Sequence, residues 1–254
     1  MTQEDKNNFI INPLPVLKDN IIWIWIIGKQ AVVIDPSISK PVIAWLKAKN
    51  LNLKAILQTH HHEDHIGGTK ALLNEWPSAE VIASKNDLTR IPFQTISVTD
   101  GTIFSLMGCL IEVLDIPGHT NAHIAFYLRE EGEKVKKPVL FCGDTLFGGG
   151  CGRIFEGSME DMYKSLNRIK SLPSGTNIFC AHEYTESNLR WAYSLYPGDI
   201  LIKARLQEVI KKREKGLQSL PTSLAEEKMT NLFLRAESIK EFSFLRKHKD
   251  NWAG

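Results

Sequence analysis

Four short apolar runs in this sequence each end in a residue that can bind a metal ion. His60 follows AILQT, His119 follows VLDIPG, Asp144 follows VLFCG, and His182 follows NIFCA. Their β-branched and aromatic residues, bounded by turn-forming residues, predict that these runs are strands. Strand ends are where a rigid scaffold meets solvent, so groups placed there can converge on one site. The sequence therefore predicts a sheet protein with a polar site built at the ends of its strands.

A histidine-rich segment, THHHEDHIGG at residues 59–68, adds further candidate ligands. In extended backbone, residues i and i+2 point to the same side, so His60 and His62 can reach a common point while the histidine between them faces away. Asp64 and His65 follow as the chain turns into a helix that we expect to begin at the glycine pair, where the missing side chains let the backbone pass closely. The segment thus contributes four ligands to the predicted site.

The number of candidate ligands indicates two metal ions rather than one. One zinc ion takes about four ligands, and a catalytic zinc keeps one position for water, so seven ligands suit two ions that share a carboxylate. Nitrogen and oxygen donors without a thiolate suit zinc, iron or manganese. We expect zinc, with iron or manganese as alternatives. The seven candidates are His60, His62, Asp64, His65, His119, Asp144 and His182.

Each of these residues also has a simpler interpretation. A histidine after a strand is often a hydrogen-bonded surface residue, and an aspartate in a Gly-Asp-Thr sequence is often a turn residue. A histidine run can be a purification tag, but tags lie at termini and lack the embedded Glu-Asp-His. Only the joint occurrence favours a metal site. His123 is expected to act at most as a hydrogen-bonding partner of that site.

The rest of the chain predicts two domains. With 43% hydrophobic and 24% charged residues, the 254-residue chain has the composition of a globular protein. Strand and helix patterns are mixed up to about residue 182, and helical patterns alone follow from Thr185 onward. We therefore expect a sheet-containing catalytic domain at residues 1–182 and a smaller all-helical domain at residues 183–254.

Composition and the absence of targeting signals predict the location of the protein and its classes of partner. The acidic start of the chain does not resemble a signal peptide, and the longest apolar run, at residues 21–27, is too short to span a bilayer. We expect a cytoplasmic monomer without a membrane partner, whose four cysteines are free thiols. The net charge of +2 argues against nucleic acid as a partner. However, residues 201–254 hold 12 basic and 7 acidic residues, which leaves a non-enzymatic nucleic-acid-binding module as an alternative.

The motifs resemble those of a known superfamily. T-H-x-H-x-D-H, PGHT, GDTLF and AHEY together resemble the metallo-β-lactamase superfamily. Within it, GDTLFGGGCGRIFEG, AHEYTESNLRWA, TSLAEEKMTNLFLR and RKHKD resemble glyoxalase II, the hydroxyacylglutathione hydrolases, over about residues 17–250. The resemblance implies an α+β fold, a four-layer αββα sandwich followed by an all-helical domain.

The resemblance also implies the division of the ligands and the reaction. One ion would be held by His60, His62 and His119, the other by Asp64, His65 and His182, with Asp144 as the bridge. A hydroxide bridging the two metal ions, oriented by Asp64, would attack the thioester of S-D-lactoylglutathione and related 2-hydroxyacylglutathiones. The products would be glutathione and D-lactate, as in methylglyoxal detoxification. The thiol leaves readily as thiolate because its pKa is about 8.5.

Substrate contacts are likewise implied by the resemblance. Arg246 and Lys249 would bind the glycine carboxylate of glutathione, with Arg153 and Tyr184 near its cysteinyl backbone. Phe155 stands where the family often has a tyrosine, and we expect the missing hydroxyl to weaken substrate affinity.

The sequence departs from the family motifs at two further positions, and one alternative reaction is open. Arg153 replaces a common lysine and keeps the charge, whereas Leu232, where Asn-Pro-Phe is usual, has no interpretation. The alternative on the same scaffold is a persulfide dioxygenase that uses one iron, against which the helical C-terminal region argues.

Overall fold

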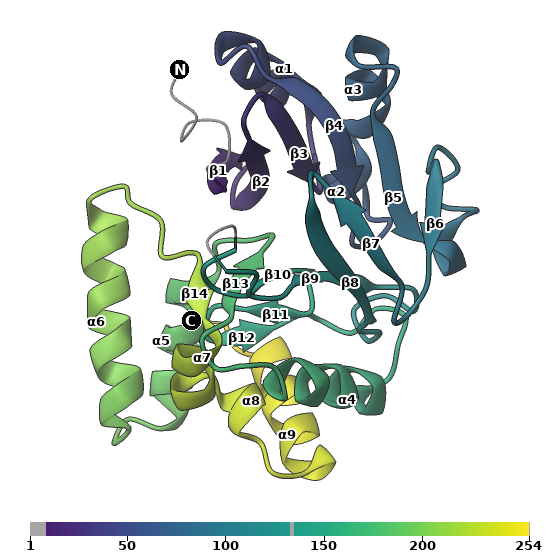
Figure 1. Cartoon of the computed structure of the whole chain (residues 1–254). Coiled ribbons are helices and arrows are strands. Elements are labelled where there is room, and N and C mark those ends of the chain that lie inside the picture. Colours follow the sequence, from purple (N-terminus) through teal and green to yellow (C-terminus); the bar gives the residue numbers. More distant parts are fainter. Residues whose placement is uncertain (1–8, 133–134, 254) are drawn as a thin grey trace. The chain divides into compact units, whose positions relative to one another are not determined.

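The computed structural model describes residues 9–132 and 135–253 (Figure 1). They form two compact units, which we call the first unit, Met1–Asp115 with Ile124–Gly143, and the second unit, Ile116–His123 with Asp144–Gly254. Residues 1–8, on which the expectation about a signal peptide depends, lie outside the described part. Among the described helices, none combines the length and the apolar character needed to cross a membrane.

The first unit is built mainly from strands. Strands β1 to β6 form one sheet in this order, antiparallel from β1 to β3 and parallel from β3 to β6. Strands β7 to β10 pair antiparallel with their neighbours in sequence. The elements are β1 Ile10–Val16, β2 Asn20–Ile27, β3 Gln30–Ile34, α1 Ser39–Ala48, β4 Asn52–Leu57, α2 Glu63–Ile66, α3 Thr69–Glu75, β5 Glu80–Ser84, the 3₁₀ helix Lys85–Asp87, β6 Ile96–Val98, β7 Ile103–Leu106, β8 Cys109–Asp115, β9 Ile124–Leu128 and β10 Val139–Gly143.

Strand β2 of the sheet β1–β6 is buried on both faces. Ile22 and Ile24 of β2 pack with apolar side chains of α1 and α3, which cover one face. Trp23 and Trp25 alternate with them, point to the other face and are almost fully buried. Burial on both faces explains why this strand reads as a continuous apolar run.

Strand β1 was not predicted, because Pro13 and Pro15 lie within it. Proline lacks the backbone donor and is normally confined to edge strands. The structure agrees with this rule, since β1 is the edge of its sheet and pairs only with β2. The strands β6 and β7 were also missed, because they are short and half-exposed.

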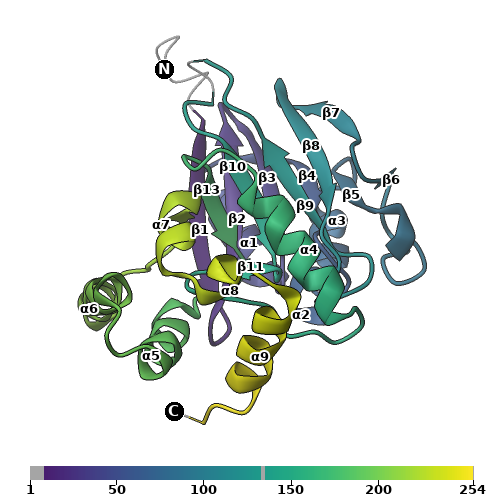
Figure 2. The same cartoon turned by 90° about the horizontal axis from the view of Figure 1, so that it is seen from below.

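The second unit contains most of the helices. Its elements are β11 Leu146–Phe147, β12 Gly150–Cys151, α4 Met159–Lys170, β13 Asn177–Cys180, α5 Thr185–Leu195, α6 Ile200–Glu214, β14 Thr222–Ser223, α7 Leu224–Thr230, α8 Leu232–Arg235 and α9 Ile239–Asp250. Figure 2 shows the helices α5 to α9 at the green and yellow end of the chain. The predicted helical region is therefore confirmed, apart from β14, which pairs with β13.

Local signals explain where these helices begin. The side chain of Ser223 accepts a hydrogen bond from the backbone of Glu226 and caps α7, as its sequence pattern predicts. Asp199 caps α6 and Ser238 caps α9 in the same manner. The caps satisfy backbone donors that the first turn of a helix leaves unpaired.

The four cysteines are buried free thiols, as predicted. Burial raises the pKa of Cys151 to about 11, against the opposing effect of the nearby Arg246. This thiol therefore stays protonated at neutral pH and has a packing role.

Candidate metal centre

In the first unit, an aspartate at the end of β3 fixes the start of the histidine-rich segment. Asp35 accepts hydrogen bonds from the backbone nitrogen of Thr59 at 2.8 Å and from its hydroxyl at 2.7 Å. The two residues meet because β3 and β4 are parallel neighbours, so their carboxyl ends lie at the same edge. Asp35 has a φ of 49°, a conformation that is uncommon for residues other than glycine and that the two bonds help to hold. The direction of His60, the next residue, is thereby set.

The histidines of this segment face one another. Nε2 of His60 lies 3.1 Å from Nδ1 of His62. The ring centroids of His60 and His65 are 4.0 Å apart, and both residues are fully buried. Ring nitrogens this close together can take part in one metal centre.

Asp64 and His65 lie on a short helix of their own, which corrects one prediction. The helix expected to begin at the glycine pair begins at Thr69, as α3, whereas α2 precedes the glycines. A Cβ on Gly68 would lie 2.7 Å from a backbone oxygen of Pro36, so the glycines permit a close approach to the loop after β3. The close approach holds α2, with its two candidate ligands, against the end of the sheet.

The two candidate ligands on α2 each have a supporting partner. The side-chain amide of Asn20 donates to the backbone oxygen and to the carboxylate of Asp64, both at 3.2 Å. Nδ1 of His65 lies 3.1 Å from the Asp35 carboxylate, and its Nε2 lies 3.8 Å from that of Asp64. Because a carboxylate holds Nδ1, the other ring nitrogen faces Asp64 and is available as a ligand.

In the second unit, Asp144 lies between two histidines. One carboxylate oxygen is 3.5 Å from Nε2 of His119, and the other is 3.4 Å from Nε2 of His182. All three residues are buried, with exposed fractions of 7% or less. A carboxylate whose two oxygens face different imidazoles has the geometry required of a bridging ligand.

The surroundings of this second cluster orient it. Nδ1 of His119 donates to the backbone oxygen of Arg153 at 2.8 Å, which leaves Nε2 for a ligand role. His123 accepts a hydrogen bond from the backbone nitrogen of Asp144 at 3.1 Å, the supporting role expected of it. The ring of Tyr184 stacks on that of His182 with centroids 4.9 Å apart. The nitrogen and oxygen donors, with their second nitrogens engaged, fit divalent metal ions.

The residues predicted to bind substrate also lie in the second unit. Phe155 is 64% exposed and its ring lies 5.2 Å from that of His119. Arg246 is buried, donates to the backbone oxygen of Cys151 at 2.9 Å and pairs with Asp250 at 2.8 Å. Arg153 is mostly exposed and lies 3.7 Å from the same aspartate.

Among the residues predicted to bind substrate, Lys249 has an amine with a lowered pKa. Its Nζ lies over the rings of Trp252, at 4.4 Å from the centroid, and Trp191, at 5.6 Å. Burial, and then the positive charges of Arg246 and Arg153, lower the pKa of Lys249 to about 8. Three cations with one neighbouring carboxylate make a site that favours an anion.

Comparison with known proteins identifies the family. Residues 14–182 match the family model of the metallo-beta-lactamase superfamily, and residues 183–252 match that of the hydroxyacylglutathione hydrolase C-terminus. The hydroxyacylglutathione hydrolase of Prochlorococcus marinus (strain MIT 9211) is 60% identical over 252 residues, which are 99% of each chain. The chain belongs to the hydroxyacylglutathione hydrolases.

Solved structures agree with the predicted fold class. ETHE1 from Myxococcus xanthus is 26% identical, with 94% of this chain and 90% of that chain covered and a TM-score of 0.68. The protein TTHA1623, solved in a di-iron-bound form, is 27% identical, with 68% and 91% covered and a TM-score of 0.55. The metallo-β-lactamase sandwich with a helical C-terminal region is therefore confirmed.

Two supporting residues of this hydroxyacylglutathione hydrolase were missed in the sequence. Asp35 follows the apolar run AVVI, so the strand-end pattern that revealed the other acids and histidines could have found it. Asn20 begins β2 and carries no comparable signal, because an asparagine beside a strand usually marks a turn.

Proposed function

We propose that the chain hydrolyses S-D-lactoylglutathione and related 2-hydroxyacylglutathiones to glutathione and the free 2-hydroxy acid, with two divalent metal ions. The observation that carries this proposal is the Asp144 carboxylate, whose two oxygens face different buried imidazoles. Membership of the hydroxyacylglutathione hydrolases supports the choice of reaction.

The proposed ligands divide between the two ions with Asp144 shared. Donor chemistry supports zinc, with iron or manganese as alternatives, and the di-iron form of TTHA1623 supports keeping iron among them. The first ion is assigned to His60, His62 and His119, and the second to Asp64, His65 and His182.

The ions, when bound, supply a water molecule whose pKa falls toward about 7 and which can therefore attack at neutral pH. Asp64, whose carboxylate is held by Asn20, is proposed to orient this water toward the thioester carbonyl. The glutathione sulfur leaves as thiolate, so no side chain is needed as a general acid.

The glutathione moiety is assigned to the cationic residues of the second unit. Lys249 and the exposed Arg153 are proposed to contact carboxylate and backbone groups, while Arg246 adds charge from a buried position. Tyr184 is proposed near the cysteinyl part because its ring stacks on His182. Phe155 lines the same region without a hydroxyl.

The lowered pKa of Lys249 predicts a pH-dependent KM. The amine is charged below about pH 8 and neutral above it, so KM should rise as pH increases through this value. A bound carboxylate favours the charged amine, so kcat should change less than kcat/KM. Steady-state kinetics between pH 6.5 and 9.5 measure both.

Two lysine variants of α9 test the assignment of that pH dependence. Lys249→Met should have a high KM at every pH, because the charge is absent throughout. The matched variant Lys247→Met, an exposed lysine of the same helix, should keep the profile of the wild-type protein. An unchanged profile in Lys249→Met would show that another group titrates.

The proposed reaction is tested by hydrolysis of S-D-lactoylglutathione alongside metal analysis of the same sample. We expect release of one thiol per thioester with two ions per chain. One iron per chain with oxygen consumption would indicate a persulfide dioxygenase instead. Salt-sensitive nucleic-acid binding without hydrolysis would indicate a binding module.

We also propose the remaining features of the enzyme from the same observations. The matched family models meet between residues 182 and 183, which supports a catalytic domain at 1–182 and a helical substrate-binding domain at 183–254. A cytoplasmic monomer is our proposal for its location and oligomeric state.

A further inference from the structure

Three consecutive glycines, Gly148–Gly150, follow β11, and the last of them begins β12. We call them the glycine turn. A Cβ on Gly148 would lie 2.3 Å from the hydroxyl of Thr185, and one on Gly150 would lie 2.3 Å from the amide of Asn188. Gly149 has a φ of +66°, which side chains rarely adopt. The turn therefore lies directly against α5, and no larger residue fits there.

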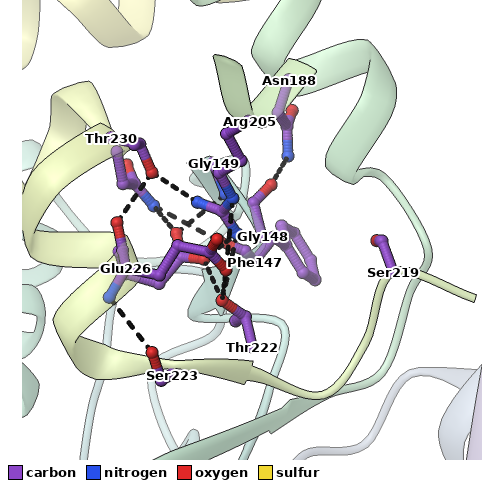
Figure 3. A network of polar contacts seen from close by, with 12 residues as sticks. Phe147, Gly148, Gly149, Asn188, Arg205, Ser219, Thr222, Ser223, Glu226 and Thr230 are labelled. Carbon is purple, nitrogen blue, oxygen red and sulfur yellow. Dashed lines mark hydrogen bonds and ion pairs between the residues drawn. The ribbon is translucent and has the colours of Figure 1, made fainter. Parts of the chain in front are cut away.

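The backbone of this turn is hydrogen-bonded by side chains from the helical part of the second unit. Glu227 of α7 accepts from the backbone nitrogen of Gly149 at 2.8 Å. Two buried asparagines donate to carbonyl oxygens of the same turn. Asn188 Nδ2 donates to Gly148 O at 3.0 Å (Figure 3). Asn231 Nδ2 donates to Gly150 O at 2.9 Å and to Phe147 O at 3.3 Å.

Glu227 is a fully buried carboxylate with several partners. One oxygen forms an ion pair with Arg205 of α6 and lies 2.8 Å from the hydroxyl of Thr222. The other accepts from Gly149 and, at 3.0 Å, from Asn231. A buried ion pair often stabilises a fold no more than an apolar pair of the same size would. The hydrogen bonds that its second oxygen accepts from Gly149 and Asn231 thus explain a buried charge at Glu227 better than fold stability does.

The two ends of the β11–β12 hairpin carry parts of the proposed metal centre. Asp144 precedes the hairpin, and a backbone bond of 3.1 Å from Gly152 to Thr145 closes it. At the other end, the carbonyl of Arg153 accepts from His119 and orients that imidazole. A Cβ on Gly152 would lie 2.0 Å from the backbone oxygen of Asp144, so the two ends are in direct contact.

We propose that Glu227 is a positioning residue of the metal centre. It holds the glycine turn, and the turn holds the hairpin whose ends carry the carboxylate of Asp144 and the carbonyl that orients His119. The helical region thus contributes to metal binding as well as to substrate binding. This inference rests on the proposed function, because it concerns the same centre.

Glu227→Gln tests the inference with little change in volume. The glutamine oxygen can accept a hydrogen bond from either Gly149 or Arg205. Its amide nitrogen, which cannot accept a hydrogen bond, then faces the other donor. Residues that support ligands typically change metal affinity by about 10- to 100-fold when replaced. We expect at least about a 10-fold rise in the apparent dissociation constant for zinc, measured by competition with a chelating dye.

Glu226→Gln is the matched control on the same helix. Glu226 lies 3.5 Å from Arg205 and 3.0 Å from Thr222, so it shares the partners of Glu227, but none of its described bonds reaches the glycine turn. Zinc affinity in this variant should stay within about twofold of the wild-type value.

A second variant keeps the inference testable if Glu227→Gln does not fold. Asn188→Leu removes the donor to Gly148 and keeps the branched arrangement of side-chain heavy atoms, and a smaller loss of zinc affinity is expected. Wild-type affinity in a folded Glu227→Gln, or in Asn188→Leu if the former is unfolded, would overturn the inference. Because zinc binding is measured without substrate, a metal-loaded wild-type protein that leaves the thioester intact would overturn the proposed function alone.

Discussion

Replacing Asp144 with asparagine is expected to remove metal and activity together. An amide has one oxygen that can bind a metal ion, and its nitrogen carries protons, so it cannot face both His119 and His182 as the carboxylate does. Since supporting residues alone change affinity by about 10- to 100-fold, loss of the bridge should lower kcat/KM by at least about 100-fold. Elemental analysis and thioester hydrolysis on the same sample measure both quantities.

Asp100→Asn is a suitable control for that change. Asp100 is an exposed aspartate that accepts a hydrogen bond from the backbone of Asp115, and an asparagine oxygen can accept the same bond. Its metal content and activity should equal those of the wild-type protein. Two ions per chain and full activity in Asp144→Asn would show that this residue is not the bridge.

Arg205→Met is expected to have the largest effect on stability. Arg205 is 5% exposed and donates to the hydroxyls of Thr230 and Thr222 in addition to its ion pair. Its loss leaves the buried charge of Glu227 without its cation, which typically costs about 3–5 kcal/mol in the free energy of unfolding. Urea denaturation followed by circular dichroism measures this quantity.

Two further variants test whether the unpaired buried charge causes the loss of stability in Arg205→Met. Arg129→Met breaks the exposed pair with Glu112, 2.6 Å apart, and should cost far less than Arg205→Met, because solvent screens exposed charges. The double variant Arg205→Met with Glu227→Leu should regain much of the lost stability, because neither charge then remains buried alone. Equal losses for Arg205→Met and Arg129→Met would contradict the assigned role of the buried pair.

The candidate ligands could be picked out in the sequence because few residue types bind metal ions and these residues recur at strand ends. His60, His119, Asp144 and His182 each follow a strand that the structure contains. The supporting residues lack such a signal. Glu227 lies beside Glu226 in the charged segment LAEEKMT, and only the fold distinguishes the fully buried carboxylate from its half-buried neighbour.

Sequence patterns also did not predict two backbone elements, the short helix α2 and the strand β1. The helix of Asp64 and His65 is a single turn of four residues, too short for any periodicity to indicate. Strand β1 contains two prolines, which argue against a strand unless it is known to be an edge. In both places the neighbouring elements, rather than local preference, decide the conformation.

The most direct test of the account is anomalous X-ray diffraction from crystals of the metal-loaded protein. We expect two peaks about 3.5 to 4 Å apart, each bound by three of the assigned side chains and both bound by the Asp144 carboxylate. A single peak, or two peaks that Asp144 does not join, would contradict the proposed binuclear centre.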